Sequence, residues 1–264
     1  MKRILLPLTI ALLATATGFA QGTKSGLDKD FGARISLTAD KKIIKGLHVS
    51  VTGEARMTDD FNTLGRYQGT LGVSYKFNNS FKIGAGYSFI NKKNASDAWK
   101  PRHRVTLDGT YTLPVGPWRF SLKETLQLTL RDIKNTYQNN PASLALKSRF
   151  KIAYKGFKSV TPYVYAELRT VLNDPSFKAT WNAAELVYDS YESTGNKDMY
   201  VNRLRGVAGL EWKLNKRNAL DFYVLSDYCY EKNIDTNSKG TVLKSLTYDR
   251  ALNTHFCIGY KFSF

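Results

Sequence analysis

Apolar and polar residues alternate along most of the chain from residue 31 onward. In the last stretch, 253–264, the apolar residues occupy every second position: Phe256, Ile258, Tyr260, Phe262 and Phe264. A β-strand turns successive side chains to opposite faces, so this spacing gives one aromatic face and one small or polar face. Similar segments, separated by turn-forming residues, recur through the chain. The sequence therefore predicts an all-β fold.

The connections between these segments alternate in length. Short ones follow Phe77, Leu113, Tyr154 and Leu214, and longer ones follow Met57, Asn91, Arg131, Leu172 and Tyr230. Short periplasmic turns and longer extracellular loops alternate in this way in outer-membrane barrels. We therefore predict a transmembrane antiparallel β-barrel whose last strand ends on the periplasmic side. About eleven segments can be counted, but bacterial single-chain barrels have even strand numbers, so we expect twelve strands, with ten as the alternative.

The first residues predict export. Lys2 and Arg3 precede a short apolar stretch, and Gly18 and Ala20 place small residues where a signal peptidase cuts. We expect a signal peptide at 1–20, a leader at 21–30 and the barrel at 31–264. The mean hydropathy of −0.36 fits a barrel, because every second strand residue of a barrel is polar. The predicted location is the outer membrane of a Gram-negative bacterium.

The charge balance indicates anionic partners. Lys and Arg number 39 against 22 Asp and Glu, a formal net charge of +17. A basic excess often indicates nucleic-acid binding, but an exported chain meets little nucleic acid, and no nucleic-acid-binding motif is present. We expect contacts with outer-membrane lipid and the phosphates of lipopolysaccharide, and with anionic solutes.

Most charged residues fall on the polar face of the predicted strands, which lines the interior of a membrane barrel. The expected lining residues are Arg56, Arg66, Arg104, Arg119, Lys123, Arg131, Lys147, Arg149, Arg169, Arg203, Arg205, Glu54, Glu167 and Glu211. Rings of Arg and Lys select for anions. Alternatively, Arg–carboxylate bridges fill a narrow barrel, since interior space grows with strand number. Both a pore and a plugged barrel follow from this pattern.

Cysteines and histidines give few candidates for chemistry. Cys229 and Cys257 lie on the inward face of the last two strands, and an oxidising compartment allows a disulfide between them, within strict geometric limits. His48 and Ser50 share a strand face, as a catalytic pair would, but the default interpretation is that they are polar wall residues. No pair of histidines has metal-ligand spacing. We expect no metal, no cofactor and no enzymatic activity.

Glu124 breaks the alternation, because it falls on the apolar face among leucines. A charge on the lipid face is costly in mid-bilayer. We expect a local bulge that turns Glu124 inward, and the alternative is a subunit contact with the outward Ser148 on the next strand.

Several features together resemble a known family. They are the signal peptide, Glu54-Ala55-Arg56, PYVYAELR at 162–169, NRLRGVAGLEWKL at 202–214 and the terminal aromatic residue. The chain is similar to outer-membrane barrels classed as a domain of unknown function. Its end resembles the signal read by the barrel-assembly machinery, which implies this role for Tyr260, Phe262 and Phe264. By size it is also distantly similar to small oligosaccharide-specific porins.

These observations favour a narrow passive channel for small anionic solutes such as acidic oligosaccharides. The alternative is a non-conducting barrel that binds a partner or lipopolysaccharide through basic loops. The loop lysines in question are Lys92, Lys93, Lys100, Lys134, Lys232 and Lys239.

Overall fold

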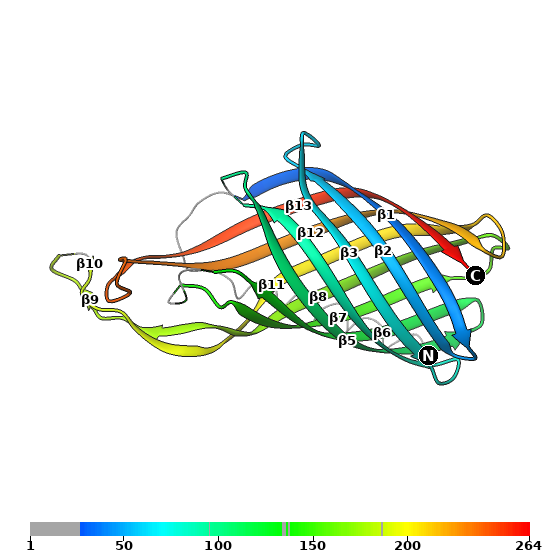
Figure 1. Cartoon of the computed structure of the whole chain (residues 1–264), viewed down its shortest axis with the longest axis horizontal. Coiled ribbons are helices and arrows are strands. Elements are labelled where there is room, and N and C mark those ends of the chain that lie inside the picture. Colours follow the sequence, from blue (N-terminus) through cyan, green and yellow to red (C-terminus); the bar gives the residue numbers. More distant parts are fainter. Residues whose placement is uncertain (1–26, 95, 134–135, 137, 186) are drawn as a thin grey trace, which may run out of the picture.

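A computed structural model describes residues 27–264, apart from residues 95, 134, 135, 137 and 186; the predicted signal peptide lies outside this range. Eleven strands close into one barrel (Figure 1). They are β1 (Asp28–Ile44), β2 (Leu47–Thr58), β3 (Thr63–Lys76), β4 (Phe81–Lys93), β5 (Trp99–Val115), β6 (Trp118–Arg131), β7 (Ala142–Tyr154), β8 (Val160–Lys178), β11 (Glu192–Lys213), β12 (Asn218–Thr236) and β13 (Leu243–Ser263). The short strands β9 (Trp181–Asn182) and β10 (Val187–Tyr188) form a separate two-stranded sheet. No helix within the described ranges is long and apolar enough to cross a membrane.

The barrel closes through a parallel pair. β1 and β13 run in the same direction, from Asp28 opposite Ala251 to Asp40 opposite Ser263, whereas the other neighbouring strands in the barrel are antiparallel. A ring in which every neighbour is antiparallel requires an even number of strands. The expected number of twelve, or ten, is therefore wrong. The eleven segments identified in the sequence are the strands of the barrel wall. The expectation that a bacterial single-chain barrel has an even number of strands led to the wrong number.

The outer face of the barrel is apolar, as the alternation predicts. Leu37 is 61% exposed and Leu71 is 58% exposed, and both lie between small residues that face the interior. Along β3, exposed and partly buried positions alternate nearly residue by residue. This face would be unusual on a soluble monomer, because large contiguous apolar patches usually mark an interaction surface.

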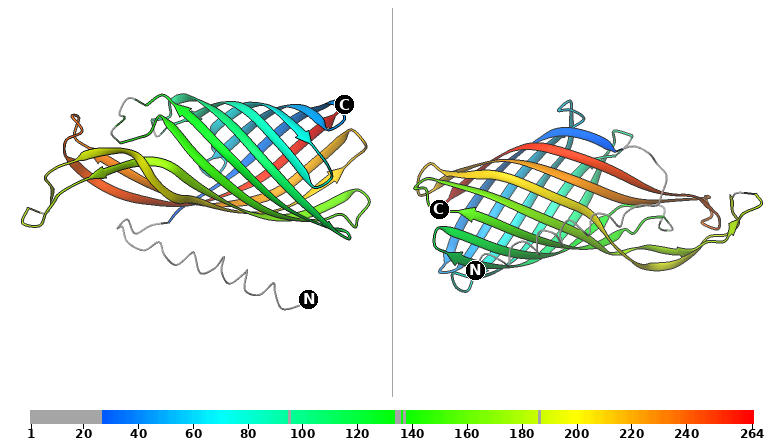
Figure 2. Two further views of the ribbon diagram at one scale, coloured as in Figure 1. Left: turned by 90° about the horizontal axis from the view of Figure 1, so that it is seen from below. Right: turned by 180° about the vertical axis from the view of Figure 1, so that it is seen from behind.

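The two ends of the barrel differ. We call the end that carries the connections after β1, β3, β5, β7 and β11, together with the end of β13, the turn end; the opposite end is the loop end. At the loop end, β8, β11, β12 and β13 continue well beyond the other strands (Figures 1 and 2). These four strands have 19, 22, 19 and 21 residues, whereas a tilted membrane strand needs about 10.

The long connection expected after Leu172 contains the end of β8 and the start of β11. Glu192 lies opposite Lys178 at the far end of this hairpin. Four register shifts interrupt the pairing of β11 with β8 between Ser193 and Arg203. Each shift breaks the two-residue period, which explains why the sequence pattern concealed these strands. One connection also proved shorter than expected, since only residues 59–62 separate β2 from β3.

The two halves of the interior wall carry side chains of different size. β3 and β4 present small residues such as Gly72, Gly86 and Ser88, with Thr70 hydrogen bonded to Ser88 at 2.8 Å. The strand order places β8, β11 and β12 across the barrel from them, and these strands carry buried residues such as Glu167. The small residues leave room for long side chains from the opposite wall.

Candidate functional site

A layer of ion pairs occupies the middle of the interior. We call it the ion-pair layer; it consists of Arg34, Arg149, Glu167, Arg203, Arg205 and Asp227. These residues come from β1, β7, β8, β11 and β12. Glu167 is 2% exposed and Asp227 is 5% exposed. Buried charges are retained in proteins when they are paired and hydrogen bonded, and both carboxylates meet this condition.

Each carboxylate of the layer is shared among several arginines. Arg205 donates to Asp227 through Nε at 2.6 Å and Nη2 at 2.7 Å, the two-pronged geometry that makes such pairs strong. Arg149 donates to Glu167 at 2.6 and 2.9 Å. Arg203 donates to Glu167 at 3.0 Å and lies 3.9 Å from Asp227. The four arginines outnumber the two carboxylates, so the layer as a whole is cationic.

Aromatic side chains pack beside this layer toward the turn end. Tyr163 donates from its hydroxyl to Asp221 at 2.9 Å. The ammonium of Lys151 lies 3.6 Å from the centre of the Tyr163 ring, and the Arg149 guanidinium lies 4.3 Å from the Tyr165 ring. A cation over an aromatic face is attracted by the ring quadrupole. These contacts narrow the interior next to the ion-pair layer.

Between the ion-pair layer and the loop end, cations lie directly opposite other cations. We call the cations of this region the cationic belt; it consists of Arg66, Lys92, Arg102, Arg104, Arg131, Lys147 and Arg169. Arg104 lies opposite the uncharged Ser88 and Thr129. The register pairs Arg66 with Lys92, Arg102 with Arg131, and Lys147 with Arg169. Like charges in direct cross-strand positions destabilise a sheet. The belt therefore costs stability in the fold.

The cationic belt has no close ion-pair partners among the described residues. None of its seven members forms an ion pair with a carboxylate in the described part of the chain. Arg104 donates to Thr129 at 3.2 Å and Arg131 to the carbonyl of Asn140 at 2.9 Å. The buried Nε atoms of Arg66 and Arg131 have no hydrogen-bond partner among the described residues. Such donors and charges suit an anion.

The other predicted lining residues belong to different parts of the interior. Glu54 pairs with Arg56 on β2. Lys123 lies 3.2 Å from Asp108 on the neighbouring strand. Arg119 lies at the turn end, where it donates to backbone carbonyls of its own turn.

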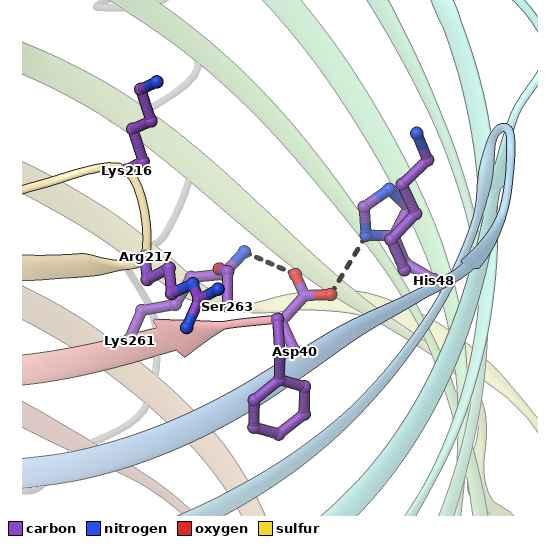
Figure 3. Close-up of a pocket in the computed structure, with 8 residues that line it drawn as sticks. Asp40, His48, Lys216, Arg217, Lys261 and Ser263 are labelled. Carbon is purple, nitrogen blue, oxygen red and sulfur yellow. Dashed lines mark hydrogen bonds and ion pairs between the residues drawn. The ribbon is translucent and has the colours of Figure 1, made fainter.

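Glu211 lines a cavity of about 250 Å³ near the turn end. A larger cavity, of about 320 Å³, opens at the same end. We call the larger one the turn-end pocket. In its centre, Asp40 accepts hydrogen bonds from His48 at 3.0 Å and from Lys261 at 2.5 Å (Figure 3).

Several interior residues were not singled out as site residues from the sequence. Arg34 and Asp227 belong to the ion-pair layer, Lys92 and Arg102 to the cationic belt, and Asp40 to the turn-end pocket. The alternation in their strands puts Arg34 and Asp227 on inward faces. The signal that could have added the others is the same alternation, continued to the strand ends.

The disulfide hypothesis is wrong. Cys229 and Cys257 are both free, and the register places Cys229 opposite Ala251 and Cys257 opposite Tyr223. Six residues along β12 therefore separate the two levels, which corresponds to about 20 Å, far beyond the reach of a disulfide. Height along the barrel depends on the exact register of β12 and β13, which the sequence pattern does not specify.

The expected bulge at Glu124 is also wrong. The pairing of β6 with both neighbours is continuous around Glu124, so its side chain remains on the outer face. There it accepts a hydrogen bond from Ser148 of the same chain, the residue expected to be its partner in the alternative, and a subunit contact stays a prediction. The cost of the outward-facing carboxylate is reduced by a polar partner, while the strand stays regular.

The terminal aromatic residues line the end of β13. The rings of Phe262 and Phe264 pack edge to face, 4.8 Å apart, and the Tyr260 hydroxyl bonds to Asn218. Their role in assembly stays a prediction.

The basic loops of the alternative interpretation are less available than expected. Lys232 is bound between Asp198 at 2.6 Å and Asp174 at 3.1 Å. Lys93 pairs with Asp97. Lys92 belongs to the cationic belt, and Lys134 lies outside the described residues.

A protein-family model with the description "Protein of unknown function (DUF2490)" matches residues 31–238. No curated protein matches the sequence. The matched range begins within β1 and ends just after β12, so it contains almost the whole barrel, including the ion-pair layer and the cationic belt.

Proposed function

The chain belongs to the DUF2490 family, described as proteins of unknown function, and we propose that this member is a narrow outer-membrane channel for small anions. The apolar outer face supports the membrane location, since an outer-membrane barrel carries an apolar band toward lipid. Fractionation of cells that express the full chain should find it with the outer membrane. Recovery in the periplasmic fraction would contradict this part of the proposal.

The cationic belt is the observation that carries the anion preference. Six of its seven members lie in like-charge cross-strand pairs, as Arg66 does opposite Lys92, and none of the seven forms an ion pair with a carboxylate in the described part of the chain. A ring of Arg and Lys favours negative solutes. The stability cost of this arrangement is explained if the belt serves the passage of anions rather than the fold.

The ion-pair layer supports the proposal that the solute is small. The side chains of this layer that pair with Glu167 and Asp227 narrow the interior between the cationic belt and the turn end. Because arginines outnumber carboxylates there, the narrow part remains favourable for negative charge. Acidic oligosaccharides are a solute class with suitable chemistry, because their carboxylates are spaced along a slender chain.

The test is conductance of the refolded protein in a planar bilayer under a salt gradient. We expect steady steps and a reversal potential that favours chloride. The double variant Arg66→Gln and Arg169→Gln removes two charges of the belt, and it should shift the reversal potential toward zero or toward cations. A control, Lys155→Gln with Lys158→Gln, removes two charges from the exposed turn between β7 and β8 and should leave the selectivity unchanged. Cation-selective steps from the unmodified barrel would contradict the proposal.

The burial of the ion-pair layer favours a second candidate, a non-conducting barrel that binds anions at the belt from the loop end. Glu167 and Asp227 are almost fully buried, as in a plugged interior. Absence of steps from a correctly folded barrel, together with saturable anion binding that the Arg66→Gln and Arg169→Gln variant loses, would support this candidate instead.

A further inference from the structure

The turn-end pocket lies at the opposite end of the interior from the cationic belt. It combines side chains from β1, β2, β13 and the turn between β11 and β12 (Figure 3). Its lining residues are Asp40, Lys42, His48, Lys216, Arg217, Lys261, Ser263 and Phe264. Segments far apart in the sequence thus converge on one cavity, and the parallel pairing of β1 with β13 brings Asp40 beside Ser263.

Cations outnumber acids in this pocket. Asp40 carries the acidic side chain among the lining residues, and both of its oxygens are occupied: Oδ1 accepts from His48 and Oδ2 from Lys261. Lys42, Lys216 and Arg217 form no ion pair with any described residue. Three cationic side chains therefore border the cavity without an ion-pair partner among the described residues.

We infer that the turn-end pocket binds the phosphate group of a small soluble anion. Lys and Arg are the usual side-chain partners of phosphate, and three separate cations suit a tetrahedral group with several charged oxygens better than a flat carboxylate. The Ser263 hydroxyl adds a donor to the lining. Asp40 serves as a positioning residue, because its two hydrogen bonds fix His48 and Lys261 at the side of the cavity.

A soluble phosphate fits the pocket better than a lipid headgroup. By the alternation of their strands, Asp40, His48 and Lys261 lie on the interior face, while a lipid would cover the outer face. The inference goes beyond the proposed channel function, since binding at equilibrium requires no conduction and does not involve the cationic belt.

The test uses the full mature chain, refolded in detergent and titrated with inorganic phosphate by isothermal calorimetry. We expect saturable binding. The double variant Lys216→Gln and Arg217→Gln changes two exposed turn residues, so it should fold, and it should weaken phosphate binding by about tenfold, the loss of one or two charge-assisted contacts. The matched control, Lys155→Gln with Lys158→Gln, removes the same charge from a neighbouring turn outside the pocket and should bind phosphate normally.

Several outcomes would overturn the inference. Equal weakening by the two double variants would show a general effect of surface charge. Acetate binding as tightly as phosphate would remove the preference for a phosphate group, and tighter binding of dihexanoyl phosphatidylglycerol would identify a lipid site. Absence of saturable binding would refute the site itself. The Arg66→Gln and Arg169→Gln variant should keep phosphate binding at this pocket, so failure of the channel proposal can be told apart from failure of this inference.

Discussion

Ser148 Oγ lies 2.6 Å from Glu124 Oε2 on the outer face of the barrel. Glu124 occupies the middle of β6, between the exposed Leu122 and Leu126. The residue opposite Glu124 on the other neighbouring strand, β5, is Gly109, which has no polar side chain. A carboxylate in this position is held by one hydroxyl and is otherwise directed toward the region that lipid would cover.

Replacement of Glu124 by Leu should therefore stabilise the protein in lipid. We expect a gain of about 1–2 kcal/mol in the free energy of unfolding, since acidic residues on the lipid face of a barrel are destabilising at mid-depth, though less so than basic ones. Denaturant titration in phosphatidylcholine vesicles measures it. Ser148→Ala provides the complementary variant, because it leaves the carboxylate without its donor and should destabilise. A loss of stability in Glu124→Leu would indicate that the outer face at this point contacts something other than lipid.

Glu167→Gln should destabilise the barrel strongly. Glu167 lies among Arg149, Arg203 and Arg205, and its loss leaves the buried Arg205 and the partly buried Arg149 and Arg203 with less compensation. Breaking a buried ion pair costs about 3–5 kcal/mol. The midpoint of denaturant unfolding is the measurement. Glu211→Gln is the control, since Glu211 also lines the interior but forms no ion pair with a described residue, and it should have a small effect.

Alternation of residue types was enough to predict the barrel and the direction of most side chains. Leu71 and Arg66, for instance, face outward and inward as their positions in β3 indicate. This succeeds because side-chain direction in a strand is local, and depends only on whether the position is odd or even.

Contacts between strands could not be predicted in the same way. The parallel closure of β1 on β13 and the separation of Cys229 from Cys257 depend on register between strands, which alternation does not encode at single-residue accuracy. The ion-pair layer depends further on which long side chains reach across the barrel. Arg34 and Asp227, 3.5 Å apart, are distant in the sequence and meet only after closure.

Lys232→Met should loosen the loop-end extension and leave the barrel intact. The Lys232 side chain is 6% exposed and joins Asp174 of β8 to Asp198 of β11, with a further bond to the carbonyl of Pro175. Without the ammonium, two nearby carboxylates remain unpaired. Limited proteolysis with mass spectrometry should show new cleavage within 173–199.

The control for this prediction is Lys239→Met, which changes an exposed residue of the connection between β12 and β13. It should leave the cleavage pattern as it is in the unmodified protein. Unfolding of the entire barrel in Lys232→Met would instead indicate that the extension is required for closure.

Two inward-facing cations on β7, two residues apart, should have opposite effects on the stability of the fold. Lys147 lies opposite Arg169, whereas Arg149 lies opposite Glu167. Lys147→Gln should raise stability by about 0.5 kcal/mol, because it removes a like-charge cross-strand pair. Arg149→Gln should lower it by at least about 2 kcal/mol, because it breaks a hydrogen-bonded buried ion pair.

The stability changes in these two variants should also differ in their dependence on ionic strength. The gain in Lys147→Gln should shrink as salt is raised, since salt screens repulsion between charges that water can reach, while the loss in Arg149→Gln should change little because that pair is largely buried. Denaturant unfolding at low and high sodium chloride measures both. If Lys147→Gln destabilised the barrel at every salt concentration, Lys147 would be a structural cation, and the belt would lose the feature that assigns it to anions rather than to the fold.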